Sequence, residues 1–152
     1  SFSVRSRIVA VQNQFDILHG EYAPYDGVLE YASRMGISYV AWSPLARGFL
    51  TERYLDLANI GKGDRLYDEE RITTDSNIPG MEKLHSLAKL AQEWGMKLSQ
   101  LVLSYMLSLP GMGPVIPTSS NITQLKSNAE AGKIILSEEQ IKDIKKFVPI
   151  KS

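Results

Sequence analysis

Residues 114–128, PVIPTSSNITQLKSN, decide the fold of this chain. The apolar run 114–117 predicts a buried strand, and the small hydroxyl side chains at 118–120 predict a short polar turn after it. Asn121 is a favoured N-cap residue, so we expect a helix to begin there. A strand, a polar turn and a helix N-terminus in this order suit the binding of an anion such as phosphate. The same pattern is common in connections that bind nothing, so both interpretations stay open at this point.

The composition favours one ordinary soluble domain. The chain has 152 residues, of which 43% are hydrophobic, and its 17 basic residues balance its 17 acidic residues. This balance argues against a nucleic acid or a membrane surface as partner. No cysteine is present, which excludes disulfides and cysteine-based metal or nucleophilic sites, and we predict no metal site. No apolar run approaches the ~20 residues of a membrane span, and we expect a cytoplasmic location.

Strand-like and helix-like segments alternate along the chain. Strands are expected at 8–11, 37–42 and 114–117, and helices at 25–35, 79–94, 99–110, 121–131 and from Ser137 onward. A long polar connection separates the second strand from the next helix, at 43–77. Such alternation predicts an α/β protein with a parallel sheet. An open sheet and a closed barrel both fit this pattern, although the G-x-G-x-x-G sequence of dinucleotide-binding open sheets is absent.

Three further segments carry a resemblance to a known family. They are VAVQNQFD at 9–16, SYVAWSPLARGFLT at 38–51 and LSQLVLSYML at 98–107. Together with 114–128, and in this order, they resemble the C-terminal half of the aldo/keto reductase family, from about Val9 to Phe147. The resemblance implies the C-terminal part of a TIM (β/α)8 barrel.

Only three clear strands are present, whereas a full barrel needs eight strands and about 250 residues. We therefore interpret residues 1–152 as a single, incomplete barrel domain, made of about the last three βα units and a C-terminal helix. The missing N-terminal half is expected elsewhere, in the same protein or in a partner chain. A stand-alone half barrel would expose strand edges and apolar faces and should self-associate.

The family reduces carbonyls with a hydride from a nicotinamide cofactor, and its catalytic Tyr, Lys, Asp and His lie on early strands. The resemblance therefore implies no catalytic residue in this chain. Tyr39 is expected in the core and Tyr105 on a helix. His85 is expected on a helix surface, and His19 in a solvated loop.

The same resemblance implies that this half holds the cofactor. Gln12 matches the glutamine that binds the nicotinamide carboxamide, unless it is an ordinary polar residue at a strand end. Trp42 matches the aromatic residue that stacks on the nicotinamide ring, unless it is a core tryptophan. The turn that grips the pyrophosphate would comprise Ser43, Pro44, Leu45, Arg47 and Gly48.

At the adenosine end, the matching residues are Pro117, Thr118, Ser119, Ser120, Gln124 and Asn128. Members of the family that prefer NADP often place an arginine where this chain has Gln124, and a neutral amide is a weaker partner for the 2′-phosphate. We expect NADP as cofactor, with NAD also possible.

Two functions follow from the resemblance. The first is an NAD(P)H-dependent oxidoreductase that reduces small aldehydes or ketones to alcohols, with this chain inactive alone because it lacks the catalytic residues. The second is a non-catalytic, NADP-binding regulatory or assembly subunit similar to potassium-channel β subunits.

Overall fold

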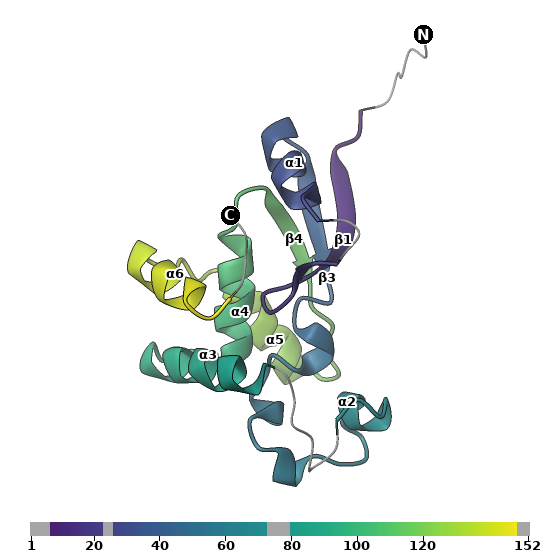
Figure 1. Cartoon of the computed structure of the whole chain (residues 1–152), viewed down its shortest axis with the longest axis vertical. Helices are drawn as coiled ribbons and strands as arrows, with labels where there is room; N and C mark the ends of the chain where they lie inside the picture. The colour runs from purple at the N-terminus through teal and green to yellow at the C-terminus, as the bar shows by residue number, and fades with distance from the viewer. Residues whose placement is uncertain (1–6, 23–25, 73–79, 149–152) are drawn as a thin grey trace.

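A computed structural model describes residues 7–22, 26–72 and 80–148. It contains a four-stranded sheet in the order β2-β1-β3-β4 (Figure 1). The strands β1 (Ala10–Asp16), β3 (Ser38–Trp42) and β4 (Met112–Ile116) are parallel, and the short β2 (Gly20–Glu21) runs antiparallel to β1. The predicted parallel α/β arrangement is confirmed.

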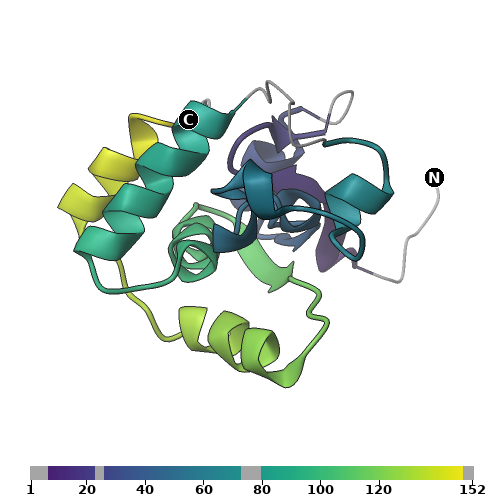
Figure 2. The same cartoon turned by 90° about the horizontal axis from the view of Figure 1, so that it is seen from below.

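Five longer helices accompany the sheet in the part of the chain that the structure describes. They are α1 (Val28–Met35), α3 (Met81–Glu93), α4 (Leu98–Leu107), α5 (Ile122–Ala131) and α6 (Glu138–Lys145). Helix α1 packs on β3 and α4 packs on β4, while α3 and α5 pack on α4. Helix α6 lies beside α3, as Figures 1 and 2 both show. Most of the core therefore lies between the sheet and α4.

The two faces of the sheet differ in burial. Tyr39 and Ala41 alternate with Val40 and Trp42 along β3, so the two pairs point to opposite faces. Tyr39 and Ala41 are fully buried on the face that the helices cover, whereas Trp42 is 41% exposed. Its register partner on β4, Ile116, is 43% exposed. The described residues therefore leave the second face of the sheet open at Trp42 and Ile116.

Strand β1 lies further along the sequence than we predicted. We expected residues 8–11 with Gln12 at the end, but the strand runs from Ala10 to Asp16 and Gln12 lies within it. The reason is pairing: Gln12, Asn13 and Gln14 continue the parallel ladder with β3, so polar residues that suggested a strand end are held by the neighbouring strand. The chain turns only at Asp16, whose carboxylate accepts hydrogen bonds from the N–H groups of Leu18 and His19.

We predicted N-caps at Ser99, Asn121 and Ser137, and the last two are confirmed. Asn121 and Ser137 are the N-caps of α5 and α6, and their side chains accept hydrogen bonds from the N–H groups of Gln124 and Gln140. The prediction that Ser99 caps α4 is wrong, because α4 begins at Leu98. The Glu52 carboxylate reaches the Leu98 N–H at 2.6 Å, so a distant segment supplies the cap that the local sequence did not reveal.

Helix α1 also receives its cap from another element. The carboxylate of Glu21, at the end of β2, accepts hydrogen bonds from the N–H groups of Gly27 at 2.7 Å and Leu29 at 2.8 Å. Gly36 ends the helix in the left-handed conformation, as its position predicted.

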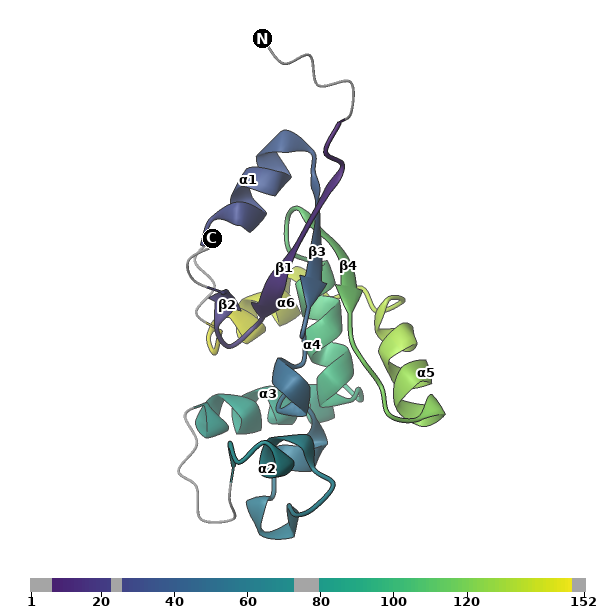
Figure 3. The same ribbon diagram turned by 90° about the vertical axis from the view of Figure 1, so that its right-hand side faces the viewer.

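The long connection after β3 is packed rather than open, as far as Ile72. It contains the 3-10 turns η1 (Ala46–Gly48), η2 (Glu52–Tyr54) and η3 (Leu57–Asn59) and the short helix α2 (Arg65–Asp68). It buries seven hydrophobic side chains: Leu45, Phe49, Leu50, Tyr54, Ile60, Leu66 and Ile72. Figure 3 shows this segment below the ends of the strands, next to α3. Residues 73–77 of the predicted connection and Pro79, the predicted start of α3, lie outside the described residues.

Other predictions for single residues agree with the structure. Tyr39 and Tyr105 are fully buried, and burial raises the pKa of both phenols. His85 is exposed on α3 and His19 is exposed in the turn after β1. Among the residues described, no helix is long and apolar enough to cross a membrane.

Candidate cofactor site

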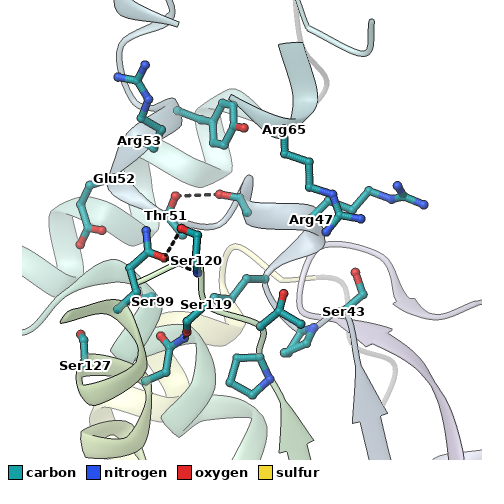
Figure 4. Close-up of a pocket in the computed structure, with 18 of the residues that line it drawn as sticks. Ser43, Arg47, Thr51, Glu52, Arg53, Arg65, Ser99, Ser119, Ser120 and Ser127 are labelled. Atoms are coloured by element: carbon teal, nitrogen blue, oxygen red, sulfur yellow. Dashed lines mark hydrogen bonds between the residues drawn. The ribbon is translucent and has the colours of Figure 1, made fainter. Parts of the chain in front are cut away.

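A cavity of about 750 Å³ lies at the carboxyl ends of β3 and β4. Its walls are the turn after β3, the segment from Thr51 to Arg65, the first turn of α4, and the turn from β4 into α5 (Figure 4). The carboxyl ends of parallel strands are where α/β barrels and open sheets place their sites. The position and size of the cavity therefore suit a ligand of nucleotide dimensions.

The structure brings together twelve of the thirteen residues that we predicted for the cofactor. The lining includes Trp42, Ser43, Pro44, Leu45, Arg47, Gly48, Pro117, Thr118, Ser119, Ser120, Gln124 and Asn128. Gln12 does not line this cavity. It pairs with Val40 and is exposed, on the open face of the sheet that also carries Trp42. Gln12 and Trp42 therefore share one face, with Trp42 nearer the carboxyl ends of the strands.

Trp42 is not a core tryptophan in this chain. It is the last residue of β3, is 41% exposed and lines the cavity. Within the described part of the chain, other residues therefore do not enclose it. An exposed indole at a strand end offers an aromatic face to a ligand.

The turn after β3 has an unusual backbone. Ser43, Ala46 and Arg47 have positive φ angles of 58°, 47° and 61°, and Gly48 follows at 98°. Residues other than glycine rarely adopt positive φ angles, and those that do concentrate at functional sites. The φ angle of 98° at position 48 favours glycine, which has no Cβ atom. The Gly48 N–H donates a hydrogen bond to the Leu45 carbonyl at 2.9 Å, so this bond within the turn helps to hold its shape.

The turn after β4 is organised by its own side chains. Asn128 donates a hydrogen bond to Ser119 Oγ at 3.0 Å. Gln124 Oε1 accepts from both the N–H and the hydroxyl of Ser120. The Gln124 amide therefore braces the turn at the helix N-terminus. An arginine at this position would instead present a charge.

The cavity is lined by more cations than anions. The charged lining residues are Arg47, Arg53, Arg65, Lys97, Glu52 and Asp64. Arg53 pairs with Asp64, and this hydrogen bond holds the pKa of the Asp64 carboxyl below its usual range. The Glu52 carboxylate accepts a hydrogen bond from the Leu98 N–H at the start of α4. Arg47 and Arg65 share the carboxylate of Glu69, at 2.8 and 2.9 Å. The balance of charge favours an anionic ligand.

Several lining residues were not predicted from the sequence. They are Thr51, Glu52, Arg53, Tyr54, Gly63, Asp64, Arg65, Lys97, Ser99, Ile116 and Ser127. Most lie in the connection or at the start of α4, where no motif has a fixed spacing. The interleaved arginines and acids at 52–71 were the one available signal, because such residues pair when the chain folds back on itself.

One lining residue has an unsatisfied hydroxyl. Ser127 Oγ is buried and, among the described residues, has no hydrogen-bond partner. A buried polar atom without a partner is uncommon, and here it adjoins the cavity.

Comparison with known proteins assigns the chain to a family. The profile of the aldo/keto reductase family matches residues 4–149, and the chain belongs to this family. It is 28% identical over 124 residues to the aldo-keto reductase str7 of Strobilurus tenacellus, covering 82% of this chain and 37% of that protein. It is 26% identical over 147 residues to the probable pyridoxal reductase 2 of Schizosaccharomyces pombe, covering 93% and 44%. The chain thus spans less than half the length of these relatives.

Solved structures support the fold. The holo form of the aldo-keto reductase AKR11C1 from Bacillus halodurans superimposes with a TM-score of 0.65 at 24% identity, covering 95% of this chain and 44% of that one. The thermostable aldo-keto reductase Tm1743, in complex with the inhibitor epalrestat, gives a TM-score of 0.65 at 24% identity and covers 94% and 41%. The expected fold, the C-terminal part of a TIM barrel, is confirmed.

Proposed function

We propose that this chain is the cofactor-binding half of an NAD(P)H-dependent oxidoreductase that reduces small aldehydes or ketones. The observation that carries the proposal is the single cavity that gathers twelve of the thirteen matched residues at the strand ends. Family membership supports the class of reaction. The cofactor supplies the hydride when it is bound.

The residues of the cavity have separable roles in this proposal. Trp42 offers its indole face to the nicotinamide ring, and Gln12 reaches the carboxamide from the same face of the sheet. Arg47 and the positive N-terminus of α5 attract the phosphates. Ser119, Ser120 and Asn128 hold the adenosine end. The general acid comes from residues outside this chain, so the chain alone does not reduce carbonyls.

The test is a calorimetric titration of the purified protein with NADPH and with NADH. We expect both to bind, with Kd values that differ by less than about tenfold, because Gln124 places no charge at the 2′-phosphate. Gln124→Arg should tighten NADPH about tenfold or more and leave NADH within about twofold, as a charge-assisted pair to phosphate would. Thr123→Arg, one residue away on the exposed helix surface, is the matched control. No binding of either nucleotide would refute the proposed site.

The second candidate function is a non-catalytic NADP-binding regulatory subunit, which the same cavity would also serve. The absorbance of NADPH at 340 nm separates the two. It should fall on adding a short-chain aldehyde to the enzyme when a polypeptide that supplies the rest of the barrel is present, and it should not fall for a regulatory subunit. Cofactor binding without turnover would favour the regulatory function. The cytoplasmic location and the carbonyl substrate also remain proposals.

A further inference from the structure

Three arginines converge on one carboxylate at the edge of the cavity. Glu69 Oε2 accepts from Arg47 at 2.8 Å, and Glu69 Oε1 accepts from Arg65 at 2.9 Å. Arg71 lies 3.4 Å from Oε2. Figure 4 shows Arg47 and Arg65 next to each other on one side of the cavity, and both line it. One negative charge faces three positive charges, so the cluster has unsatisfied positive charge.

The ion pairs of this cluster are exchangeable. The side chains of Arg47 and Glu69 are 39% and 30% exposed, so water screens their attraction. Exposed pairs of this kind contribute little net stability. Phosphate groups bind arginine more strongly than a single exposed carboxylate does, because they carry more charge and more acceptor oxygens. An anion with two phosphates can therefore compete for the same guanidinium groups.

We propose that Glu69 is an internal competitor of the ligand: it holds Arg47 and Arg65 at the edge of the cavity, and a diphosphate group displaces it. This inference rests on the proposed function, because it assumes that the anion entering the cavity is a diphosphate. Glu69 then tunes the affinity for the ligand without touching it. Its carboxylate must release the two arginines before they reach the phosphates.

The test is a calorimetric titration with inorganic pyrophosphate at low ionic strength. Glu69→Gln should bind pyrophosphate about three- to tenfold more tightly than the unmodified protein, because the charge that competes for the two arginines is gone. Glu69→Asp keeps a carboxylate and should restore most of the weaker affinity. Glu70→Gln changes the net charge equally at the next residue and should stay within about twofold of the unmodified protein.

A second variant excludes a general electrostatic effect. In a background that lacks both arginines, Arg47→Gln with Arg65→Gln, Glu69→Gln should lose most of its gain, because the competition runs through these two guanidinium groups. Equal tightening in Glu69→Gln and Glu70→Gln, or weaker binding in Glu69→Gln, would overturn the inference. Thermal melting of each variant verifies that it is folded.

The outcome is separable from that of the proposed function. Pyrophosphate binding that tightens in Glu69→Gln, in a protein that does not bind NADPH, would keep the competition and reject the proposed cofactor. Binding of NADPH, with no effect of Glu69→Gln on pyrophosphate affinity, would keep the proposed cofactor and reject the competition by Glu69.

Discussion

Trp42 and Ile116 are register partners in the parallel ladder of β3 and β4, on the face of the sheet that no helix covers among the described residues. Trp42 is the last residue of β3, and both Trp42 and Ile116 line the cavity. The indole and the isoleucine form an apolar part of the cavity lining, and Arg47, Arg53, Arg65 and Lys97 form a cationic part of it. This division suits a ligand with a flat ring at one end and phosphates at the other.

The first prediction concerns Trp42. The chain has two tryptophans, and Trp94 lies at the end of α3 outside the cavity lining. In Trp94→Phe, NADPH should quench most of the remaining fluorescence, whereas in Trp42→Phe it should quench little. Trp42→Ala should weaken NADPH about tenfold, because stacking on an aromatic ring contributes about 0.5–1.5 kcal/mol beyond the buried area. Equal quenching in the two single-tryptophan variants would contradict stacking.

The turn at 43–48 predicts opposite effects of two reciprocal substitutions. Ala46 has a φ of 47°, so Ala46→Gly should stabilise the fold by about 0.5 to 1 kcal/mol, because relief of a left-handed penalty of about 1–2 kcal/mol outweighs the extra freedom of the unfolded chain. Gly48→Ala should destabilise it by about 1–3 kcal/mol, because φ is 98° there. Urea denaturation measures both. If both substitutions shift the free energy of unfolding in the same direction, the turn does not have this backbone.

Close packing of the turn before β4 against α1 gives a third prediction. A Cβ added at Gly111 would lie 2.6 Å from Ser33 Cβ and 2.8 Å from its Cα, and φ is 81°. Gly95 has a similar φ of 67° but nothing within 4 Å of an added Cβ. Gly95→Ala therefore measures the backbone strain alone, and Gly111→Ala should cost about 1–3 kcal/mol more, because α1 must move. Equal losses of stability would show that α1 does not approach Gly111.

The arginine–carboxylate pairs of the connection predict a dependence on pH. The hydrogen bond from Arg65, followed by the interactions with Arg47, holds the pKa of Glu69 below its usual range, against the opposing effect of desolvation. A lowered folded-state pKa stabilises the fold above the unfolded value, about 4.3 for glutamate, and this contribution is lost as pH falls through the folded-state pKa. The melting temperatures of the unmodified protein and Glu69→Gln should therefore converge below about pH 4.

The matched control for this pH dependence is Glu70→Gln, because Glu70 has no resolved ion pair among the described residues. Its difference from the unmodified protein should change little over the same pH range. A Glu69→Gln difference that grows on acidification would contradict the assignment of Glu69 as a paired carboxylate.

Sequence patterns predicted the αβ alternation and two helix caps because these depend on neighbours in the chain. Asn121 reaches the Gln124 N–H three residues away, and Ser137 reaches Gln140 in the same way. The start of α4 escaped prediction because its cap comes from Glu52, 46 residues earlier. The extent of β1 escaped for the same reason, since its polar residues are held by pairing with β3.

The candidate site divides in a similar way. The resemblance located the residues of the two strand-end turns, which occur at fixed positions after strands. It did not locate Arg65 or Glu69, because they lie in a connection whose course depends on burying Leu66 and Ile72 rather than on any spacing. Gln12 was predicted at a strand end, and only the pairing of β1 shows that it lies two pairs short of Trp42.

The carboxylate of Glu21 links two elements that the chain order alone would leave independent. Because its oxygens accept hydrogen bonds from the N–H groups of Gly27 and Leu29, we expect the first turn of the helix and the β1–β2 hairpin to open together. Helix α1 leads directly into β3, the central partner of the ladder. The hydrogen-exchange rate of the Leu29 amide should consequently follow that of the Tyr22 amide in the hairpin. A fluctuation of the hairpin at the edge of the sheet would then reach α1, the helix that precedes β3.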